Sequence, residues 1–230
     1  MVSRMSQGIP STLPLAVLIA LGFILVPRIV NWYRGKKIEN FAGARGWRYQ
    51  KNAREVLARY PREYPFWRRQ DRKARHLVQF AHEGFHVESF EFSYTEGKYR
   101  HPAHMHVTSI VIPHDVPFLQ IRPENARDPV RRFFGAEDTQ FEPADFNEMW
   151  LVHGEVPEFT HDVISTQMMN WLLERPGRNF SLHRCFLFSY AGHRMVPEAI
   201  LGQADRLIEF YRQVPDYAWH RTTPGRWTKG

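Results

Sequence analysis

The longest apolar run of the chain lies near its beginning, from Ile9 to Tyr33, and no charged residue falls between Arg4 and Arg28. About 20 apolar residues in a helix, at about 1.5 Å of rise per residue, can cross the hydrocarbon layer of a bilayer. Trp32 and Tyr33 would place aromatic rings at one membrane interface, a position that such rings favour. The pattern therefore predicts one transmembrane helix at the N-terminal end.

A cleaved secretory signal is the alternative interpretation of this run. Its uninterrupted apolar centre, Leu13 to Val26, is also the size of a signal-peptide core. Such a signal needs a small-residue cleavage site soon after the core, but the A-x-A that follows begins at Ala42, beyond Lys37. An uncleaved anchor is the better interpretation.

Alternation of apolar and polar residues dominates the middle of the chain and predicts β-strands. The alternation is interrupted near Gly84, near Gly97 and from Pro113 to Pro117. Four antiparallel strands are expected, at about 76–82, 85–95, 103–112 and 118–122. In the second of them, Phe85 and Val87 are out of phase with Phe90. We therefore expect a bulge near Ser89 that brings both sets to the core side.

Helical spacing follows the strands. One helix is expected after Thr160, which can cap it. Its expected apolar face consists of Ile164, Met168, Trp171 and Leu172. A short helix is expected at 128–134, a pair of strands at 179–193, and a last helix from Pro197 onward.

Strands with helices gathered after them favour an α+β fold over a parallel doubly wound sheet. We expect an antiparallel sheet with helices packed on it, preceded by one N-terminal transmembrane helix. The expected parts are residues 1–34 as the anchor, residues 35–75 as a basic juxtamembrane connector, and residues 76–222 as the α+β domain.

The charge pattern predicts an orientation in the membrane. The net charge of the 230 residues is +7, and basic residues crowd the stretch directly after the predicted span. Arg4 alone precedes the span, whereas Arg28, Arg34, Lys36 and Lys37 follow it. Basic flanks stay on the cytoplasmic side. We expect a single-pass protein of the cell membrane, with its N-terminus outside and its body in the cytoplasm.

The same basic residues suggest a partner. Anionic lipid attracts basic residues near the membrane surface by about 1 kcal/mol each. The residues expected at this surface are Arg34, Lys36, Lys37, Arg68, Arg69, Arg72 and Lys73. Single-stranded nucleic acid is the alternative partner, but it needs aromatic side chains spaced for successive bases, and Phe66 and Trp67 are adjacent. Anionic lipid at the cytoplasmic face is therefore favoured over nucleic acid.

Histidines are the strongest candidates for chemistry, because the sequence lacks the usual nucleotide-binding, serine-hydrolase and zinc-protease motifs. Its single cysteine, Cys185, excludes an internal disulfide. His101, His104 and His106 lie near the start of the third predicted strand, with Glu91 about opposite His104, a set that could ligate zinc. The favoured interpretation is a polar outer face of the sheet, because the twelve histidines are scattered. We expect no catalytic residue, metal or cofactor.

Four motifs in order after the apolar run carry a resemblance to a known family. They are FAGARGWRY, FLQIRPEN, FEPADFNEMWLV and DVISTQMMNWLL. The chain resembles, over nearly its whole length, a family of uncharacterised single-span membrane proteins of high-GC Gram-positive bacteria that carry a domain of unknown function. The resemblance implies a bacterial, membrane-attached domain and supplies no catalytic residue.

Two functions remain open at this point. The favoured one is a membrane-anchored cytoplasmic domain that acts as a non-enzymatic interaction or scaffolding module for an unknown protein partner. The alternative is a metal-assisted hydrolase that uses the histidine cluster.

Overall fold

The computed structural model describes residues 13–60, 66, 70–96, 101–124, 139–142 and 144–220. Its centre is a six-stranded antiparallel sheet in which β1 to β5 are neighbours in that order and β6 pairs with β4. The strands are β1 Arg48–Asn52, β2 Gln70–His82, β3 Phe85–Glu96, β4 His101–Pro123, β5 Trp150–Gly154 and β6 Phe180–Ala191. The helices are α1 Leu13–Gly43, α2 Val56–Arg59, α3 Ala144–Met149, α4 Pro157–Val163, α5 Thr166–Leu173, η2 Pro197–Ala199, α6 Ile200–Gln213 and α7 Asp216–His220. This arrangement confirms the predicted α+β fold.

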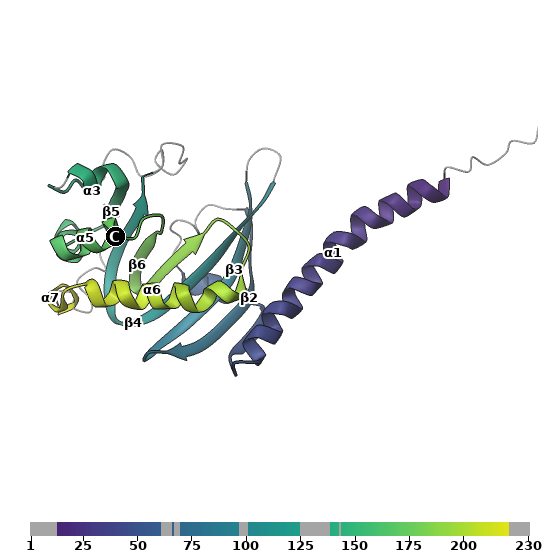
Figure 1. The fold of residues 1–230 in the computed structure, drawn as a ribbon, viewed down its shortest axis with the longest axis horizontal. Coiled ribbons are helices and arrows are strands. Elements are labelled where there is room, and N and C mark those ends of the chain that lie inside the picture. The colour runs from purple at the N-terminus through teal and green to yellow at the C-terminus, as the bar shows by residue number, and fades with distance from the viewer. Residues whose placement is uncertain are drawn as a thin grey trace, which may run out of the picture.

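Helix α1 is 31 residues long and extends away from the sheet (Figure 1). Its last turns pack on the domain, where Ile38 is 1% exposed and Ala42 is 0% exposed. Earlier in the helix, the described apolar side chains are exposed, and Phe23 is 79% exposed. Within the described residues, no helix has both the length and the apolar character that a membrane crossing needs. The structure confirms a helix over the predicted stretch but does not confirm a membrane span.

The sheet is covered on both faces, and each face has its own apolar core. Helix α6 lies across one face (Figure 1), where Val87 and Ile110 join the larger core. On the opposite face, Phe90 packs in a second core with Tyr60 and Phe66, next to α2. Both the odd and the even positions of a central strand are therefore apolar, as expected for a sheet buried on two sides.

This double burial corrects the bulge expected near Ser89. The pairing of β3 with β4 is continuous from Val87 to Glu96. Two register shifts lie instead in β2, one between Gln70 and Lys73 and one between Arg75 and Val78, and the second is opposite Ser89 and Glu91 of β3. The change of apolar phase in β3 arises because Val87 and Phe90 face different cores.

Two strands are longer than expected. The predicted third and fourth strands form one strand, β4, whose pairing with β6 shifts between Val111 and Val116 and again between Val116 and Leu119. Likewise, the expected strand pair at 179–193 is the single strand β6. The break from Pro113 to Pro117 therefore marks irregular pairing within one long strand, whereas the break near Gly84 is the turn between β2 and β3.

The helix expected after Thr160 is divided in two. Thr160 lies inside α4, where its hydroxyl donates to the carbonyl of Val156 at 2.9 Å. Ser165 is the cap of α5, because its Oγ accepts from the backbone N–H of Met168 at 3.3 Å. All four residues of the predicted apolar face, Ile164, Met168, Trp171 and Leu172, are buried. The helix expected at 128–134 lies outside the described residues.

The segment expected to be a connector, residues 35–75, contributes strands to the sheet. It contains β1 and the beginning of β2, and β1 pairs with β2 through Tyr49 and Val78. Ala53 and Val56 in the same segment are fully buried. These residues are structurally part of the folded body.

Candidate functional site

A polar pocket lies where the end of α1 meets the sheet. Its volume is about 650 Å³, and α1, β1, β2, β3 and the start of β4 contribute to its walls. Its charged lining consists of six cationic side chains, Arg28, Arg34, Lys51, Lys73, Arg75 and Arg194, and two carboxylates, Asp71 and Glu91. The excess of positive charge makes this cationic pocket the candidate functional site.

Glu91 on β3 is the buried centre of the cationic pocket and is 5% exposed. Its Oε2 accepts hydrogen bonds from Nη2 of Arg34, at 2.8 Å, and from the backbone N–H of Met195, at 3.1 Å. Its Oε1 lies 3.3 Å from Nδ1 of His104 and 3.9 Å from Nη1 of Arg194. Glu91 therefore joins α1, the sheet and the segment before α6.

The charge of Glu91 follows from these contacts. Burial raises the pKa of the Glu91 carboxyl, because it removes water from the charged form. The hydrogen bond and positive charge of Arg34, together with the Met195 N–H, outweigh burial and hold the pKa below its usual value. The carboxylate is therefore ionised at neutral pH and balances part of the charge of Arg34.

His76 fixes the distance between α1 and the sheet. It lies in the irregular part of β2 with a φ of 57° and is 7% exposed. Its Nδ1 lies 2.9 Å from the hydroxyl of Tyr49. A Cβ added at Gly35 would lie 3.0 Å from Cε1 of the ring. Glycine at position 35 therefore lets α1 approach the sheet this closely.

Two histidines are held neutral in the cationic pocket. Burial lowers the pKa of His76, and the positive charges of Arg34 and Arg75 lower it further, against an opposing carboxylate. Burial also lowers the pKa of His104, and Arg194 adds to the effect. At neutral pH both rings are uncharged and each carries one N–H. In His104 the carboxylate of Glu91 favours this N–H on Nδ1, so that ring has no second N–H for a ligand.

The residues predicted for the membrane surface have different surroundings. Arg34 and Lys73 line the cationic pocket. Lys36 forms an ion pair with Glu39 at 2.9 Å, and Lys37 forms one with Glu198 at 2.6 Å. Arg72 donates to the carbonyl of Phe66 at 2.7 Å. Arg68 and Arg69 lie outside the described residues.

The histidine cluster is brought together in part. His104 and His106 share one face of the sheet, as predicted, but Glu91 pairs with His106 and Ser93 pairs with His104. The predicted register is therefore wrong by two residues, although His104 still reaches Glu91 diagonally. The side chain of His101 is not among those that the structure describes.

His106 belongs to a buried network rather than to the pocket. Its ring is 0% exposed, with Nε2 2.9 Å from Oγ of Ser89 and Nδ1 3.3 Å from Nε2 of Gln203. The hydroxyl of Thr108 donates to Oε1 of Gln203 at 2.5 Å. Since both ring nitrogens are engaged, His106 holds α6 on the sheet, and Glu91 and His104 remain a pair.

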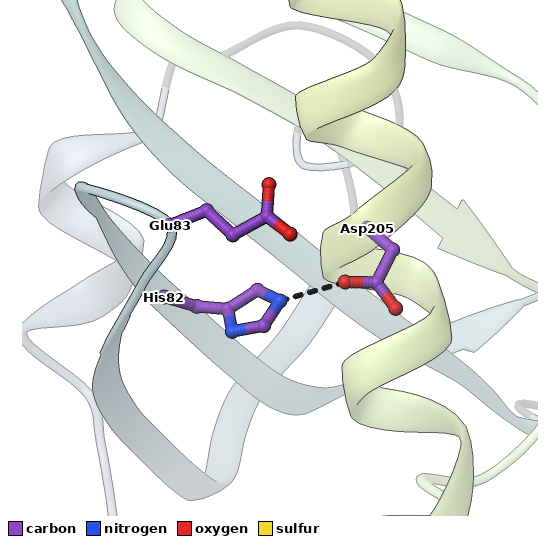
Figure 2. Close-up of side chains that lie close together, drawn as sticks. All are labelled: His82, Glu83 and Asp205. Atoms are coloured by element: carbon purple, nitrogen blue, oxygen red, sulfur yellow. Dashed lines mark hydrogen bonds and ion pairs between the residues drawn. The ribbon is translucent and has the colours of Figure 1, made fainter.

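Figure 2 shows another cluster, formed by His82, Glu83 and Asp205. In the part of the chain that the structure describes, it is the one group of three metal-ligating side chains whose ligand atoms lie within 4.8 Å of one another. His82 Nε2 lies 2.6 Å from Oδ1 of Asp205, and Glu83 Oε2 lies 2.9 Å from Nη2 of Arg212. These contacts describe a surface network of one hydrogen bond and one ion pair.

Sequence reasoning missed the cationic pocket as a unit. Arg34, Lys51 and Arg194 come from α1, from β1 and from the segment before α6, so they meet only in the folded chain. The excess of basic residues after the apolar run was a signal that charge gathers there. No local motif indicates that Arg194 joins them.

Comparisons with known protein families and with curated proteins give no match. The fold is similar to that in the crystal structure of the mycobacterial trehalose monomycolate transport factor A, TtfA. The TM-score is 0.50, and the likeness covers 78% of this chain and 90% of that chain, at 15% sequence identity. At this identity the likeness concerns the fold alone.

Proposed function

We propose that this protein is a membrane-attached, non-enzymatic interaction domain that α1 anchors in the bilayer, with the body on the cytoplasmic side. One observation carries the proposal, the contrast between the two ends of α1. Ile38 and Ala42 are buried against the body, whereas the large apolar side chains described before them, such as Phe23, are exposed. A long apolar helix surface that the protein itself leaves uncovered favours another apolar medium.

The cost of leaving this surface in water is large. The exposed apolar side chains of α1 are Val17, Ile19, Phe23, Leu25, Val26, Ile29, Val30, Trp32 and Tyr33. Burying one such side chain gains about 1.5–3 kcal/mol, so together they favour an apolar environment by on the order of 10 kcal/mol. Transfer of α1 into a bilayer supplies this environment.

The polar surroundings support the proposed orientation. Arg28 lies at the middle of α1 and Arg34 lies between it and the docked end, and both line the pocket next to the sheet. Basic residues toward that end keep it on the cytoplasmic side, where anionic lipid attracts them. Anionic lipid of that leaflet is the proposed lipid partner, and the protein partner is unknown.

The non-enzymatic interpretation rests on burial. Ser89 and His106 form a hydrogen-bonded pair of the kind that activates a nucleophile. Both are 0% exposed, so a substrate has no access to the pair in this fold. The side chains of His104 and Glu91 contact each other and their neighbours in the fold. The alternative, a metal-assisted hydrolase, would need a third metal ligand near them, and the described residues offer none.

The protein of similar fold, TtfA, is named as a transport factor for trehalose monomycolate. A role as an accessory factor in transport at a bacterial membrane is one specific form of the proposed interaction function. The sequence resemblance to single-span membrane proteins of high-GC Gram-positive bacteria points the same way.

The test is a pair of reporter fusions at the C-terminal Gly230. Alkaline phosphatase is active only outside the cytoplasm, whereas green fluorescent protein fluoresces when it folds inside. The proposal predicts a silent phosphatase fusion and a fluorescent membrane fraction. An active phosphatase fusion together with a dark fluorescent fusion contradicts the proposed orientation, and fluorescence that washes off the membrane contradicts the anchor.

A further inference from the structure

We infer that the cationic pocket between α1 and the sheet binds a phosphate group, and that the group belongs to an anionic lipid headgroup. The lipid part of this inference rests on the proposed membrane attachment, whereas the phosphate part does not. Three features of the pocket support it: the charge of its walls, the fixed positions of its guanidinium groups and its place relative to the apolar part of α1.

The walls carry more positive charge than the two carboxylates balance. All six cationic residues except Arg34 are exposed, and three of these exposed residues are Lys51, Lys73 and Arg75. These three come from the adjacent strands β1 and β2, which pair side by side. Cations gathered around a concave site create a local field that concentrates an anion there.

Two guanidinium groups are already oriented. Arg34 is held by Glu91 through Nη2, and Arg194 is held by Oδ1 of Asn31 through Nη1 at 2.9 Å. A guanidinium has five N–H donors in a planar fork that fits phosphate oxygens. Because each group is fixed by one terminal nitrogen, other donors of the fork remain for a ligand at little cost in side-chain entropy.

Two neutral imidazole rings complete the lining. The rings of His76 and His104 border the same space as the guanidinium groups. Their lowered pKa values follow from burial and from the cations around them. A bound anion would oppose that positive field, so occupation of the pocket should raise the pKa of both imidazoles.

The position of the pocket favours a lipid source for the phosphate. Arg28, Asn31 and Trp32 of α1 contribute to its wall, and they lie among the last exposed apolar residues of the helix, from Ile29 to Tyr33. If the apolar part of α1 lies in the hydrocarbon, these residues lie at the level of the headgroups, where aromatic rings also settle. A phosphate in the pocket would then occupy the depth at which lipid phosphates are found.

The experiment uses the full chain in micelles of a neutral detergent, so that binding is measured without a charged surface. The probes are dihexanoyl phosphatidic acid, dihexanoyl phosphatidylcholine, glycerol 3-phosphate and inorganic phosphate, each titrated by calorimetry. The expected result is saturable binding of phosphatidic acid at one site per chain, about tenfold tighter than that of glycerol 3-phosphate, and no binding of phosphatidylcholine.

Two variants with equal loss of charge locate the site. Lys51→Gln with Lys73→Gln removes two cations of the cationic pocket, and Lys36→Gln with Lys37→Gln removes two cations of α1 that are not part of its lining. The first pair should weaken binding at least tenfold, and the second less than twofold. All four side chains are exposed, so both variants should melt at the temperature of the parent.

The outcomes separate the claims. If both pairs of substitutions weaken binding equally, the attraction is a general property of the surface and the pocket is not the binding site. The absence of saturable binding by any phosphate would also overturn the phosphate site. Inorganic phosphate bound as tightly as phosphatidic acid keeps the phosphate site and overturns the lipid source. Loss of membrane attachment in the fusion experiment, with phosphate binding retained in detergent, would overturn the proposed function and not the site.

Discussion

The buried network around His106 predicts that the domain loses stability in mild acid. Burial lowers the pKa of His106 to about 3, and the nearby imidazole of His193 contributes to the shift. Gln203 Nε2 can only donate, so Nδ1 of the neutral ring accepts from it and Nε2–H donates to Ser89. Protonation of His106 would bury a positive charge. It would also place a second N–H of the ring against the N–H of the Gln203 amide.

The size of this loss of stability follows from the difference in the pKa of His106 between the folded and unfolded states. An unfolded histidine has a pKa of about 6.5, so between that pH and about 3 the unfolded chain binds the proton and the folded chain does not. Stability is fully present above about pH 6.5 and falls with decreasing pH at about 1.4 kcal/mol per unit. At pH 5 the loss from His106 alone is about 2 kcal/mol.

Urea unfolding of the full chain in neutral detergent, followed by tryptophan fluorescence at pH 7 and pH 5, measures this loss. The control is His106→Gln, whose amide can donate and accept in the same places and does not titrate. His76, His104 and His183 also have lowered pKa values because of burial, so the parent and the control share their contribution. The parent should lose about 2 kcal/mol more than the control between the two pH values. Equal losses would refute the assignment of a buried neutral ring to His106.

Two further substitutions test the packing of the body and the centre of the cationic pocket. A Cβ at Gly154 would lie 1.8 Å from Oγ1 of the buried Thr160. Gly154→Ala should therefore destabilise the domain by about 1–3 kcal/mol in the same unfolding assay. The double variant Gly154→Ala with Thr160→Ala should recover part of this stability. Glu91→Gln keeps the shape of the side chain but removes the charge that faces Arg34; because Arg34 is partly exposed to solvent, the cost at pH 7 should be only about 1–2 kcal/mol. Because the pKa of Glu91 is lowered in the folded state, this contribution is present above the unfolded pKa and is lost as the pH falls through the lowered folded pKa. The stabilities of the parent and Glu91→Gln should therefore converge in acid, and a constant difference would contradict the ion pair.

The fold class could be predicted from the sequence because alternation and helical spacing are local properties. Met168, Trp171 and Leu172 show the predicted helix face directly, and all three are buried. The two cores could not be separated in the same way. Val87 and Phe90 are both apolar, and only the presence of covering residues on each face decides which core each side chain enters.

The candidate site was less accessible to sequence reasoning than the fold. The sequence drew attention to Arg34 and Lys73 as basic residues and to His104 and Glu91 as possible neighbours, and all four line one pocket. What joins them is the docking of α1 on the sheet, which depends on long-range contacts such as the one between Arg34 and Glu91, 57 residues apart. Charge density is visible in a sequence, whereas concavity arises from tertiary packing.

The membrane anchor is the central claim, and resistance of the full chain to alkaline carbonate extraction tests it most directly. Two aspartates in the apolar part of α1, Phe23→Asp and Val26→Asp, should each cost about 2.5–3.5 kcal/mol at the centre of a span. The control places two aspartates on the exposed surface of the docked end, Lys36→Asp and Asn40→Asp. The account predicts that the parent and the control stay in the membrane pellet and that the apolar-face variant is released, whereas release of the parent by carbonate would contradict it.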